Sequence, residues 1–574
     1  MSLRIYNTLT RSKEEFFPLE AGIVKMYVCG VTVYDYCHLG HARAYVVWDM
    51  IRRYLATKYQ VTFVQNITDI DDKILKRALE RDTTMQAIAN QYIAAYDEDM
   101  AKLNIARADK YPRVTESKED ITKLIKKLIE GDYAYVSGDD VYYAVQKFPT
   151  YGKLSGRKLA DMQAGASGRV DEHEPYKRYP LDFALWKSAK PNEPFWPSPW
   201  GNGRPGWHIE CSAMVRSCFS NKTIDIHAGG ADLQFPHHEN EIAQSEAANK
   251  IDKDRMIKKK EDKGTISKEK AIAARKKDPK PLATFWMHNG FVNIKGEKMS
   301  KSLSNFKTIR SLMEHFEPMA IRLFILQAQY RQPIDFTEDA INSSTKGWET
   351  IRDGMLFAQD FGNKLDWETI EMPSRDGILS SIKSVLKQCY GEEQYNNDID
   401  KLNDFEPLSK YLGNTSTAPL SELALSDRSE SMLQSLDSSF RISSLIKLFE
   451  EAMDDDFNTS VALSYVFELA KKLRSERKSL LHSGEMYFSS KLLYKEWQAL
   501  SYMTNVLGFV ADISDRKTIE DKISNVQIKD LIQKRIEAKK AKNYQEGDRI
   551  REELKALGIT LIDQKDGTTR WLRT

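Results

Sequence analysis

An apolar run that leads into a loop with two histidines and a glycine limits the fold of this chain more than any other feature. The run covers residues 24–33, the loop contains His38, Gly40 and His41, and residues 42–59 follow with helical periodicity. A strand, a loop and a helix in this order are typical of an α/β fold with a parallel sheet. Backbone N–H groups at the start of a helix bind phosphate, and imidazoles can add donors from the side. The sequence therefore predicts that this loop holds phosphate groups.

A lysine-containing loop is expected much later in the chain. Residues 298–302 read Lys-Met-Ser-Lys-Ser, and Gly290 and Gly296 precede them. Two lysines on a loop can close over a triphosphate and neutralise the departing pyrophosphate. The GxxxxGK[ST] pattern of a P-loop does not occur, and the GxGxxG match at 201–206 lacks a preceding strand. The two loops together are therefore the predicted site for ATP.

Composition and cysteine usage indicate a multidomain enzyme of the cytoplasm. The 574 residues suffice for several domains, and the formal net charge of +2 means that any nucleic-acid surface must be local. The odd number and scattered positions of the cysteines argue against a disulfide framework; they are Cys29, Cys37, Cys211, Cys218 and Cys389. The sequence has neither a signal-peptide pattern nor an apolar run long enough to span a membrane. We expect a soluble cytoplasmic protein without membrane contact.

Hydrophobic periodicity predicts an α/β first part and a helical second part. Strand patterns are found at 25–33 and 61–66, helical patterns at 74–103 and 121–130, and short strand patterns at 134–136 and 141–145. A loop-rich stretch at 146–206 follows, and residues from about 338 to 512 are predominantly helical in pattern. In the tail, the hydrophobic pattern predicts one helix over 528–557 and a short strand at 559–563.

Two charged segments interrupt this pattern. Residues 250–280 contain 13 Lys or Arg against 6 Asp or Glu, and residues 391–430 contain 9 Asp or Glu against 3 Lys or Arg. Such compositions are typical of solvated insertions without fixed structure. The basic segment either contacts RNA phosphate or is a surface excursion without a function of its own.

Long local matches give the sequence a family resemblance. They are VCGVTVYDYCHLGHAR at 28–43, NITDIDDKI at 66–74, GWHIECSAM at 206–214, GGADLQFPHHENE at 229–241 and, more weakly, DDDFNT at 454–459. Residues 38–41 and 298–302 resemble the HIGH and KMSKS signatures of class I aminoacyl-tRNA synthetases, with Leu39 in place of Ile. The other matches resemble the cysteinyl-tRNA synthetase family. The resemblance covers residues 1–345 strongly, apart from the basic segment.

The resemblance implies a fold and a domain order. Residues 1–282 would form a Rossmann-like nucleotide-binding catalytic domain, with a connective insertion at roughly 105–205 and the basic insertion at 249–281. Residues 283–345 would form a KMSKS-containing stem-contact region. Residues 346–515 would form a helical anticodon-binding bundle with an acidic insertion at 391–430, and residues 516–574 a small C-terminal tRNA-binding domain. Within that last domain, Trp571 is a candidate for stacking on an RNA base.

Two cysteines, a histidine and a glutamate form a candidate zinc set. His237 and Glu241 are four residues apart, which places both on one face of a helix, and Cys29 and Cys211 each lie at an expected junction of elements. Thiolate, imidazole and carboxylate are ligands that zinc accepts. Spacing alone favours core cysteines and surface polar residues instead. The resemblance implies that these four residues hold one zinc ion per chain, which binds the thiolate of substrate cysteine.

The resemblance also implies roles for the loops and the pocket. His38 and His41 would bind the ATP phosphates, Gly40 would allow close approach of the adenosine, and Lys298 and Lys301 would bind the pyrophosphate. Thr68 and Trp207 would line the amino-acid pocket. Asp232 would face the adenosine side of the same crevice at the strand ends, as is usual in open α/β sheets. The expected substrates are L-cysteine, ATP with Mg²⁺, and tRNA(Cys), and the expected form is a monomer.

Three functions are compatible with these residues. The first is cysteine–tRNA ligation. The second is transfer of activated cysteine to an amino sugar, as in the similar ligase family of mycothiol synthesis. That family usually lacks the long helical region and tail, so the roughly 230 residues after 345 argue against this function. The third is a zinc-stabilised RNA-binding protein without catalysis. The presence of His38, His41, Lys298 and Lys301 argues against it, because a binding protein has no need for all four.

Overall fold

The chain forms two compact units. The computed structural model describes residues 2–159, 176–190, 193–219, 223–294, 296–298, 307–367, 427–511, 525–557, 559–563 and 569–573. The first unit contains Met1–Thr345 together with Glu451–Val461, and the second contains Lys346–Glu450 and Ala462–Thr574. Most of the predicted acidic insertion at 391–430 lies outside the described residues. None of the described helices has both the length and the apolar character needed to cross a membrane.

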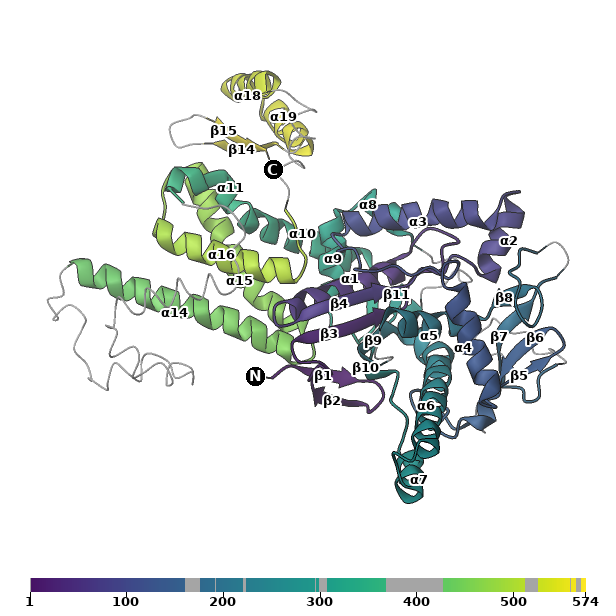
Figure 1. Cartoon of the computed structure of the whole chain (residues 1–574). Coiled ribbons are helices and arrows are strands. Elements are labelled where there is room, and N and C mark those ends of the chain that lie inside the picture. The colour runs from purple at the N-terminus through teal and green to yellow at the C-terminus, as the bar shows by residue number, and fades with distance from the viewer. Residues whose placement is uncertain are drawn as a thin grey trace. The chain divides into compact units, whose positions relative to one another are not determined.

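A four-stranded parallel sheet forms the centre of the first unit (Figure 1). Its strands in spatial order are β10 (Ala283–Asn289), β9 (Ile224–Gly230), β3 (Ile23–Val28) and β4 (Gln60–Gln65). Strand β3 pairs with both β4 and β9 in parallel register. The strand order therefore reverses between β3 and β9, and open α/β sheets bind ligands outside the carboxyl ends of the strands at such a point. The predicted α/β fold, with two halves separated by an insertion, is confirmed.

Helix α1 (Leu39–Ala56) follows β3 after a loop and packs against the sheet. It starts three residues earlier than the periodicity indicated, because the capping loop adds its first turn. Strand β3 ends at Val28, so the second half of the predicted strand at 25–33 is loop. The buried Arg43 side chain of α1 donates hydrogen bonds to the carbonyl oxygens of Gly290, Tyr330 and Gln332. This guanidinium therefore links α1 to the loops that follow the last sheet strand.

The region between the two halves of the sheet contains helices and a second sheet. Its helices are α2 (Asp72–Glu80), α3 (Met85–Lys102) and α4 (Lys118–Glu130). The predicted single helix at 74–103 is two helices, because the chain turns at Asp82, which has a φ of 49°. An antiparallel sheet follows, of strands β5 (Ala134–Ser137), β6 (Asp140–Tyr143), β7 (Phe183–Ser188) and β8 (Gly203–Pro205). The stretch at 146–206, predicted as loop, thus contributes two strands.

Three helices and a small sheet complete the surroundings of the central sheet. Helix α5 (Trp207–Cys218) precedes β9, and helix α9 (Pro318–Leu326) packs against α1. The small sheet has the order β12 (Glu297–Lys298), β11 (Val292–Ile294) and β13 (Ile334–Phe336). Helix α8 (Ile309–Met313) lies just downstream of the predicted lysine loop.

The basic segment forms two helices. Helix α6 (Glu239–Asp262) continues without a break from the active-site side into this segment, and α7 (Lys268–Lys276) returns along it. The expectation that residues 250–280 lack fixed structure is therefore wrong. Ile257 on α6 and Ala271 on α7 are buried, which provides the apolar contact that the composition concealed.

Residues 451–461 belong to the first unit, although the sequence places them inside the helical part. The buried Asp456 carboxylate accepts hydrogen bonds from the backbone N–H of Tyr6, the hydroxyl of Tyr330 and Nε of Arg331. Tyr6 lies on β1 (Arg4–Asn7), which pairs with β2 (Ser12–Glu15). The segment thus ties the first strand to the loop before β13.

The second unit is helical and ends in a small α/β tail. Its helices include part of α10 (Glu338–Met355), α11 (Phe357–Phe361), parts of α14 (Asp427–Asp454) and α15 (Thr459–His482), and α16 (Ser490–Val506). The tail contains α18 (Asn525–Lys540), α19 (Tyr544–Ala556), β14 (Ile559–Asp563) and β15 (Thr569–Arg573). The predicted helix at 528–557 is two helices, with Lys542 at a φ of 59° between them.

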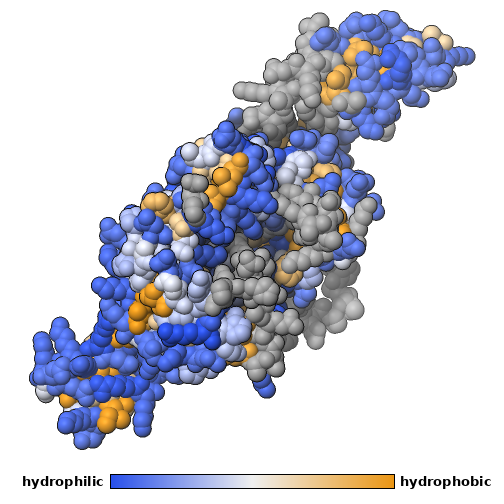
Figure 2. Space-filling view, turned by 90° about the vertical axis from the view of Figure 1, so that its right-hand side faces the viewer, coloured by the Kyte–Doolittle hydropathy of each residue, from blue (hydrophilic) through white to orange (hydrophobic). Residues whose placement is uncertain are grey.

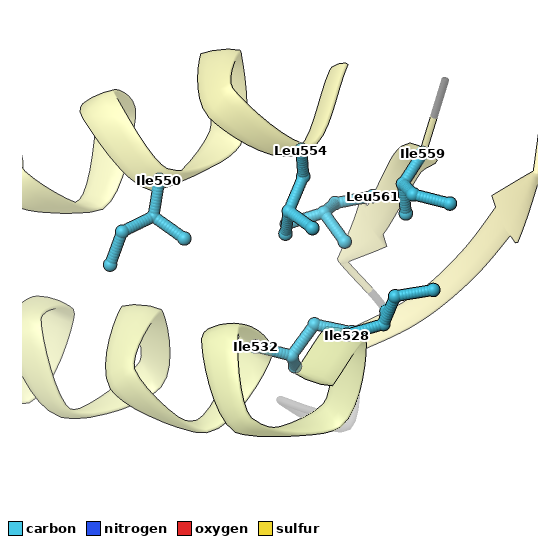
Figure 3. Packing of buried hydrophobic residues seen from close by; sticks show 6 residues of the cluster. All are labelled: Ile528, Ile532, Ile550, Leu554, Ile559 and Leu561. Carbon is cyan, nitrogen blue, oxygen red and sulfur yellow. The ribbon is translucent and has the colours of Figure 1, made fainter. Parts of the chain in front are cut away.

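The tail has its own apolar core (Figure 3). The core residues come from both helices and from β14; they are Ile528, Ile532, Ile550, Leu554, Ile559 and Leu561. Trp571 of β15 packs against this cluster, so its ring contributes to the core of the tail. The carboxylate of Asp563 closes one end, where it accepts two hydrogen bonds from the buried Arg535.

Candidate active site and metal centre

Four elements meet where the strand order reverses and bring the predicted zinc set together. Cys29 follows the last residue of β3, and Cys211 lies on the second turn of α5. Two short turns, η3 (Ala231–Leu233) and η4 (Gln234–His238), follow β9 and lead into α6. They place His237 just before α6 and Glu241 in its first turn, four residues apart as the sequence predicted.

The four side chains are buried and close enough to share one metal ion. Their candidate ligand atoms all lie within 4.8 Å of one another. The Sγ atoms of Cys29 and Cys211 are 3.9 Å apart, and Nε2 of His237 lies 3.0 Å from Oε1 of Glu241. Two thiolates, an imidazole and a carboxylate match the ligands that zinc accepts, and a buried charged cluster is stable only when its charges are paired or metal-bound. The donor set therefore fits a zinc ion.

Two side chains of the cluster, Cys211 and Glu241, are in the deprotonated state that metal binding requires. A hydrogen bond from Cys29 and the nearby His237 lower the pKa of Cys211 to about 6, although burial opposes this. Burial raises the pKa of Glu241, but His227 and His237 outweigh it and bring this pKa down to about 2. Both groups are therefore anionic near neutral pH.

The other two members are protonated near neutral pH. Burial raises the pKa of Cys29 well above its ordinary value, and Cys211 and Glu241 add to the effect. Burial lowers the pKa of His237, but Glu241 and Cys211 outweigh it and raise this pKa to about 9. Metal ligands must be deprotonated, so a metal ion entering this site displaces protons from Cys29 and His237.

A second group of potential ligands overlaps the first. Cys29, His227, His238 and Glu241 also lie within 4.8 Å of one another. In that group Nε2 of His227 is 2.9 Å from the second oxygen of Glu241, and Nδ1 of His238 is 2.8 Å from Nε2 of His288. The group has a single thiol, whereas the predicted set has two. The two groups share Cys29 and Glu241, and the imidazoles of His227 and His238 lie around the predicted set.

These surrounding imidazoles orient the predicted ligands. His227 holds the Glu241 oxygen that does not face His237, and Nδ1 of His208 lies 3.0 Å from Nδ1 of His237. Such contacts fix the tautomer and orientation of metal ligands and tune their basicity. Gly229 makes room for this arrangement, because a Cβ atom there would lie 2.9 Å from Cε1 of His238.

The sequence analysis did not identify the four surrounding histidines. They lie on α5, β9, η4 and β10; they are His208, His227, His238 and His288. The available signal was compositional, since the chain has only ten histidines and two of these four stand within apolar strand patterns. A histidine buried in a strand needs a polar partner, which points to a shared polar site.

The predicted phosphate loop forms the start of α1. His38 is the N-cap, and its Nδ1 accepts the backbone N–H of His41, while Nδ1 of His41 accepts the backbone N–H of His38. The loop is also bound to the chain beyond the predicted lysine loop, because Leu39 N–H donates to the Lys307 carbonyl oxygen and Ile309 N–H donates to that of Cys37. Lys298 lies in β12, and Lys301 falls outside the described residues.

Gly40 lies in the first turn of α1, and the three other predicted residues lie near the cluster and the carboxyl ends of the strands. Trp207 starts α5, and its ring centroid is 4.1 Å from that of His237. Thr68 is buried, and its hydroxyl donates to Oε2 of Glu210 at 3.2 Å. Asp232 lies exposed in η3, beyond the carboxyl end of β9.

Known proteins resemble this chain over its whole length. Residues 15–259 and 265–346 match the family described as tRNA synthetases class I (C) catalytic domain, and residues 448–511 match the DALR domain. The chain is similar to proteins named cysteine–tRNA ligase from Cyanothece sp. and Trichodesmium erythraeum, each 49% identical over 579 residues and 100% of both chains. It also aligns with the solved structure of Mycobacterium tuberculosis methionyl-tRNA synthetase in complex with methionyl-adenylate, at 14% identity and a TM-score of 0.42, over 84% of this chain and 89% of that one.

The full-length identity and the extent of the catalytic-domain match identify the family. The catalytic-domain match covers more than half of the chain, and the relatives are matched from end to end. The chain therefore belongs to the cysteine–tRNA ligase family of class I aminoacyl-tRNA synthetases.

Proposed function

We propose that this chain joins L-cysteine to the 3′ end of tRNA(Cys), with conversion of ATP to AMP and pyrophosphate. The observation that supports this most directly is the buried cluster of Cys29, Cys211, His237 and Glu241, which lies where the strand order reverses. The capped start of α1 lies at the carboxyl end of the neighbouring strand β3. A thiol-binding cluster and an anion-binding helix start are the two features that cysteine activation requires.

In this proposal the cluster selects the substrate. Cysteine and serine differ by one atom of similar size, and a pocket discriminates poorly between such pairs by shape. Cys29, Cys211, His237 and Glu241 would hold one zinc ion, which supplies a ligand position that prefers a thiolate to a hydroxyl. His227 and His208 hold Glu241 and His237 in place for that role.

Trp207 and Thr68 line the amino-acid pocket in this proposal. The Trp207 ring covers His237 and limits the pocket beside the metal ligands. Thr68 lies next to the buried Glu210 carboxylate, a negative group that suits the ammonium of an amino acid.

Adenylate formation depends on positioning and on charge stabilisation. The cysteine carboxylate attacks the α-phosphorus of ATP, and pyrophosphate leaves. His38 and His41 bind the phosphates, Gly40 admits the adenosine, and Asp232 contacts the adenosine side of the crevice. Lys298 and Lys301, with Mg²⁺, neutralise the pyrophosphate. The terminal ribose hydroxyl of the tRNA then takes the acyl group, so no side chain acts as a nucleophile.

The remaining parts of the chain are proposed to recognise tRNA. The stem-contact region at 283–345, the helical bundle at 346–515 and the tail at 516–574 would position the acceptor end and contact the anticodon, whose unstacked bases side chains can read. We also propose that the enzyme acts as a monomer in the cytoplasm. The described cysteines are all free thiols, as a reducing compartment requires.

Two assays on the same preparation test this function. Cysteine-dependent ATP–pyrophosphate exchange measures adenylate formation, and charging of tRNA(Cys) measures transfer. We expect both activities with cysteine and neither with serine. Exchange without charging would indicate a different acceptor, such as an amino sugar, and the absence of exchange would refute activation of cysteine.

A further inference from the structure

The end of α6 and helix α7 form a basic hairpin, defined here as residues 255–277. It contains ten Lys or Arg and three Asp or Glu, which gives a net charge of +7. Figure 1 shows α7 at the lower end of α6, and the lowest lobe in Figure 2 is mostly hydrophilic, with a small hydrophobic area. The net charge of the whole chain is only +2, so positive charge is concentrated on this hairpin.

The basic hairpin has a fixed structure. Ile257 and Ala271 are buried between its helices, and Arg275 forms an ion pair with Glu261. Nζ of Lys253 donates to the carbonyl oxygens of Arg275 and Lys277 and so caps the end of α7. The charges of the hairpin are thus displayed on a defined scaffold.

Most of the positive charge on the hairpin is not neutralised by the protein. Among the described residues of the hairpin, eight exposed lysines form no ion pair within 4 Å; they are Lys258, Lys259, Lys260, Lys263, Lys268, Lys270, Lys276 and Lys277. Glu261, one of only three acidic residues, already pairs with Arg275. Like charges held together without partners raise the local potential and attract a polyanion.

The distribution of these lysines fits a nucleic-acid backbone better than a membrane surface. Lys258, Lys259 and Lys260 are consecutive, so their side chains leave α6 about 100° apart and spread over about 200° of its circumference. A helix that lies on a membrane needs an apolar stripe opposite its charges. The hairpin exposes only two large apolar side chains by more than half, Met256 and Ile272, on different helices. Phosphates that follow a curved backbone can contact lysines on several faces.

The basic hairpin lies far from the proposed active site. Glu241 is in the first turn of α6, and Asp262 ends the same helix, which places the turn of the hairpin about 30 Å from the cluster at a rise of 1.5 Å per residue. The helix starts at the carboxyl ends of the strands and leads away from them. A tRNA 3′ end in the crevice therefore does not occupy this surface.

We propose that the basic hairpin binds the phosphate backbone of an RNA chain at a surface separate from the active site. The contact is electrostatic and independent of base sequence. It would hold the enzyme on RNA without taking part in cysteine activation or transfer.

Fluorescence anisotropy with labelled oligouridine of about 20 nucleotides tests this proposal, with salt varied between about 50 and 200 mM. The test variant is Lys258→Gln, Lys259→Gln, Lys260→Gln and Lys263→Gln combined. The control variant replaces four scattered lysines by Gln. These lysines are exposed and form no ion pair among the described residues; they are Lys76, Lys102, Lys126 and Lys190. Both variants lose the same charge, so only the position of the charge differs.

We expect the hairpin variant to lose at least about tenfold in affinity at low salt and the control to stay within about threefold. Each lost phosphate contact should also reduce the slope of log K against log salt by about 0.7. A Lys268→Gln and Lys270→Gln variant should show a smaller loss in the same direction, which guards against misfolding of α6. Charging of tRNA should keep its kcat/KM in all variants.

Three results would overturn the proposal. Equal losses in the hairpin and control variants would show a response to net charge alone. A second result concerns binding of the unmodified protein to vesicles of phosphatidylserine and phosphatidylcholine. If the hairpin variant lost this vesicle binding and kept RNA binding, the hairpin would be a membrane-binding surface. A fall in kcat/KM for tRNA charging would place the hairpin on the path of the substrate.

Discussion

The imidazoles of His38 and His41 stack with their ring centroids 3.7 Å apart, and each Nδ1 accepts the backbone N–H of the other residue. The pair therefore forms a capping box made of two histidines at the start of α1. In this position the same side chains satisfy the helix N-terminus and stand beside the proposed phosphate site.

Replacement of His38 should separate its capping role from its proposed catalytic role. His38→Asn keeps a side-chain oxygen that can accept the His41 N–H, since Asn is a favourable N-cap residue, whereas His38→Ala removes the cap at a cost of about 1 kcal/mol. We expect both variants to lose pyrophosphate exchange and only His38→Ala to lose thermal stability. If His38→Asn catalysed pyrophosphate exchange at the original rate, His38 would have only a helix-capping role.

Replacement of Cys211 should impair cysteine activation through the metal site. Cys211→Ser removes one of two thiolates, so metal content after dialysis and affinity for cysteine should both fall, while ATP binding remains. Cys218→Ser is the matched control, because Cys218 lies on the same helix and outside both ligand groups. Metal analysis and the KM for cysteine in exchange provide the readouts. An unchanged zinc content in Cys211→Ser would contradict the assignment.

Zinc affinity of the metal-free protein should rise with pH between about 6 and 9. Burial lowers the pKa of His237, but Glu241 and Cys211 raise it overall to about 9, so zinc must displace a proton from this side chain at neutral pH. The thiol of Cys29, whose pKa burial raises, loses a second proton. Because protons compete with the metal, affinity should increase by about tenfold per pH unit for each proton released. Calorimetry in buffers of different ionisation enthalpy measures that release, and affinity independent of pH would refute it.

Removal of the Asp456 charge should loosen β1. Asp456→Asn tolerates the left-handed backbone at a φ of 61° but keeps a single acceptor oxygen, so its NH₂ group must face either Arg331 or the donors of Tyr6 and Tyr330. Loss of a buried charged acceptor costs about 2–4 kcal/mol here, because Arg331 is partly exposed. Amide hydrogen exchange of Arg4–Asn7 measures the local opening.

The control for this prediction is the adjacent carboxylate. Asp455→Asn breaks an exposed ion pair with Lys13, and such pairs contribute about 0–1 kcal/mol. Similar acceleration of exchange in both variants would show that residues 451–461 act through general destabilisation and not through Asp456.

The α/β fold was predicted because it depends on long, continuous motifs, and the candidate zinc set was named through the family resemblance that those motifs carry. Cys29 and His38 share one motif with the strand before them, and His237 and Glu241 are fixed by helical spacing. The meeting of Cys29 with Cys211, 182 residues away, and with His237 and Glu241 required the fold.

The histidines around the cluster could not be predicted in the same way. His227 and His288 lie on adjacent parallel strands, β9 and β10, and no local spacing connects them. The break in the tail helix was missed for another reason. Lys542 adopts a left-handed backbone without a glycine or proline nearby to signal it, so the helical pattern appeared continuous.

The basic hairpin shows how composition can mislead. Its charge suggested a segment without structure, yet Ile257 and Ala271 bury enough apolar surface to pack two short helices together. Two buried apolar residues are a weak signal in a highly charged sequence, yet they suffice to pack the helices together.

The return of Glu451–Val461 to the first unit has a consequence for protein engineering. The catalytic unit is not a continuous segment, because the chain leaves it after Thr345, re-enters it at Glu451 and leaves it again after Val461. A chimera that exchanges the helical unit between family members at a single junction would lose the Asp456 contacts to Tyr6 and Tyr330. Functional exchange should require three junctions, at 345/346, 450/451 and 461/462, so that residues 451–461 remain with the catalytic unit whose strand they secure.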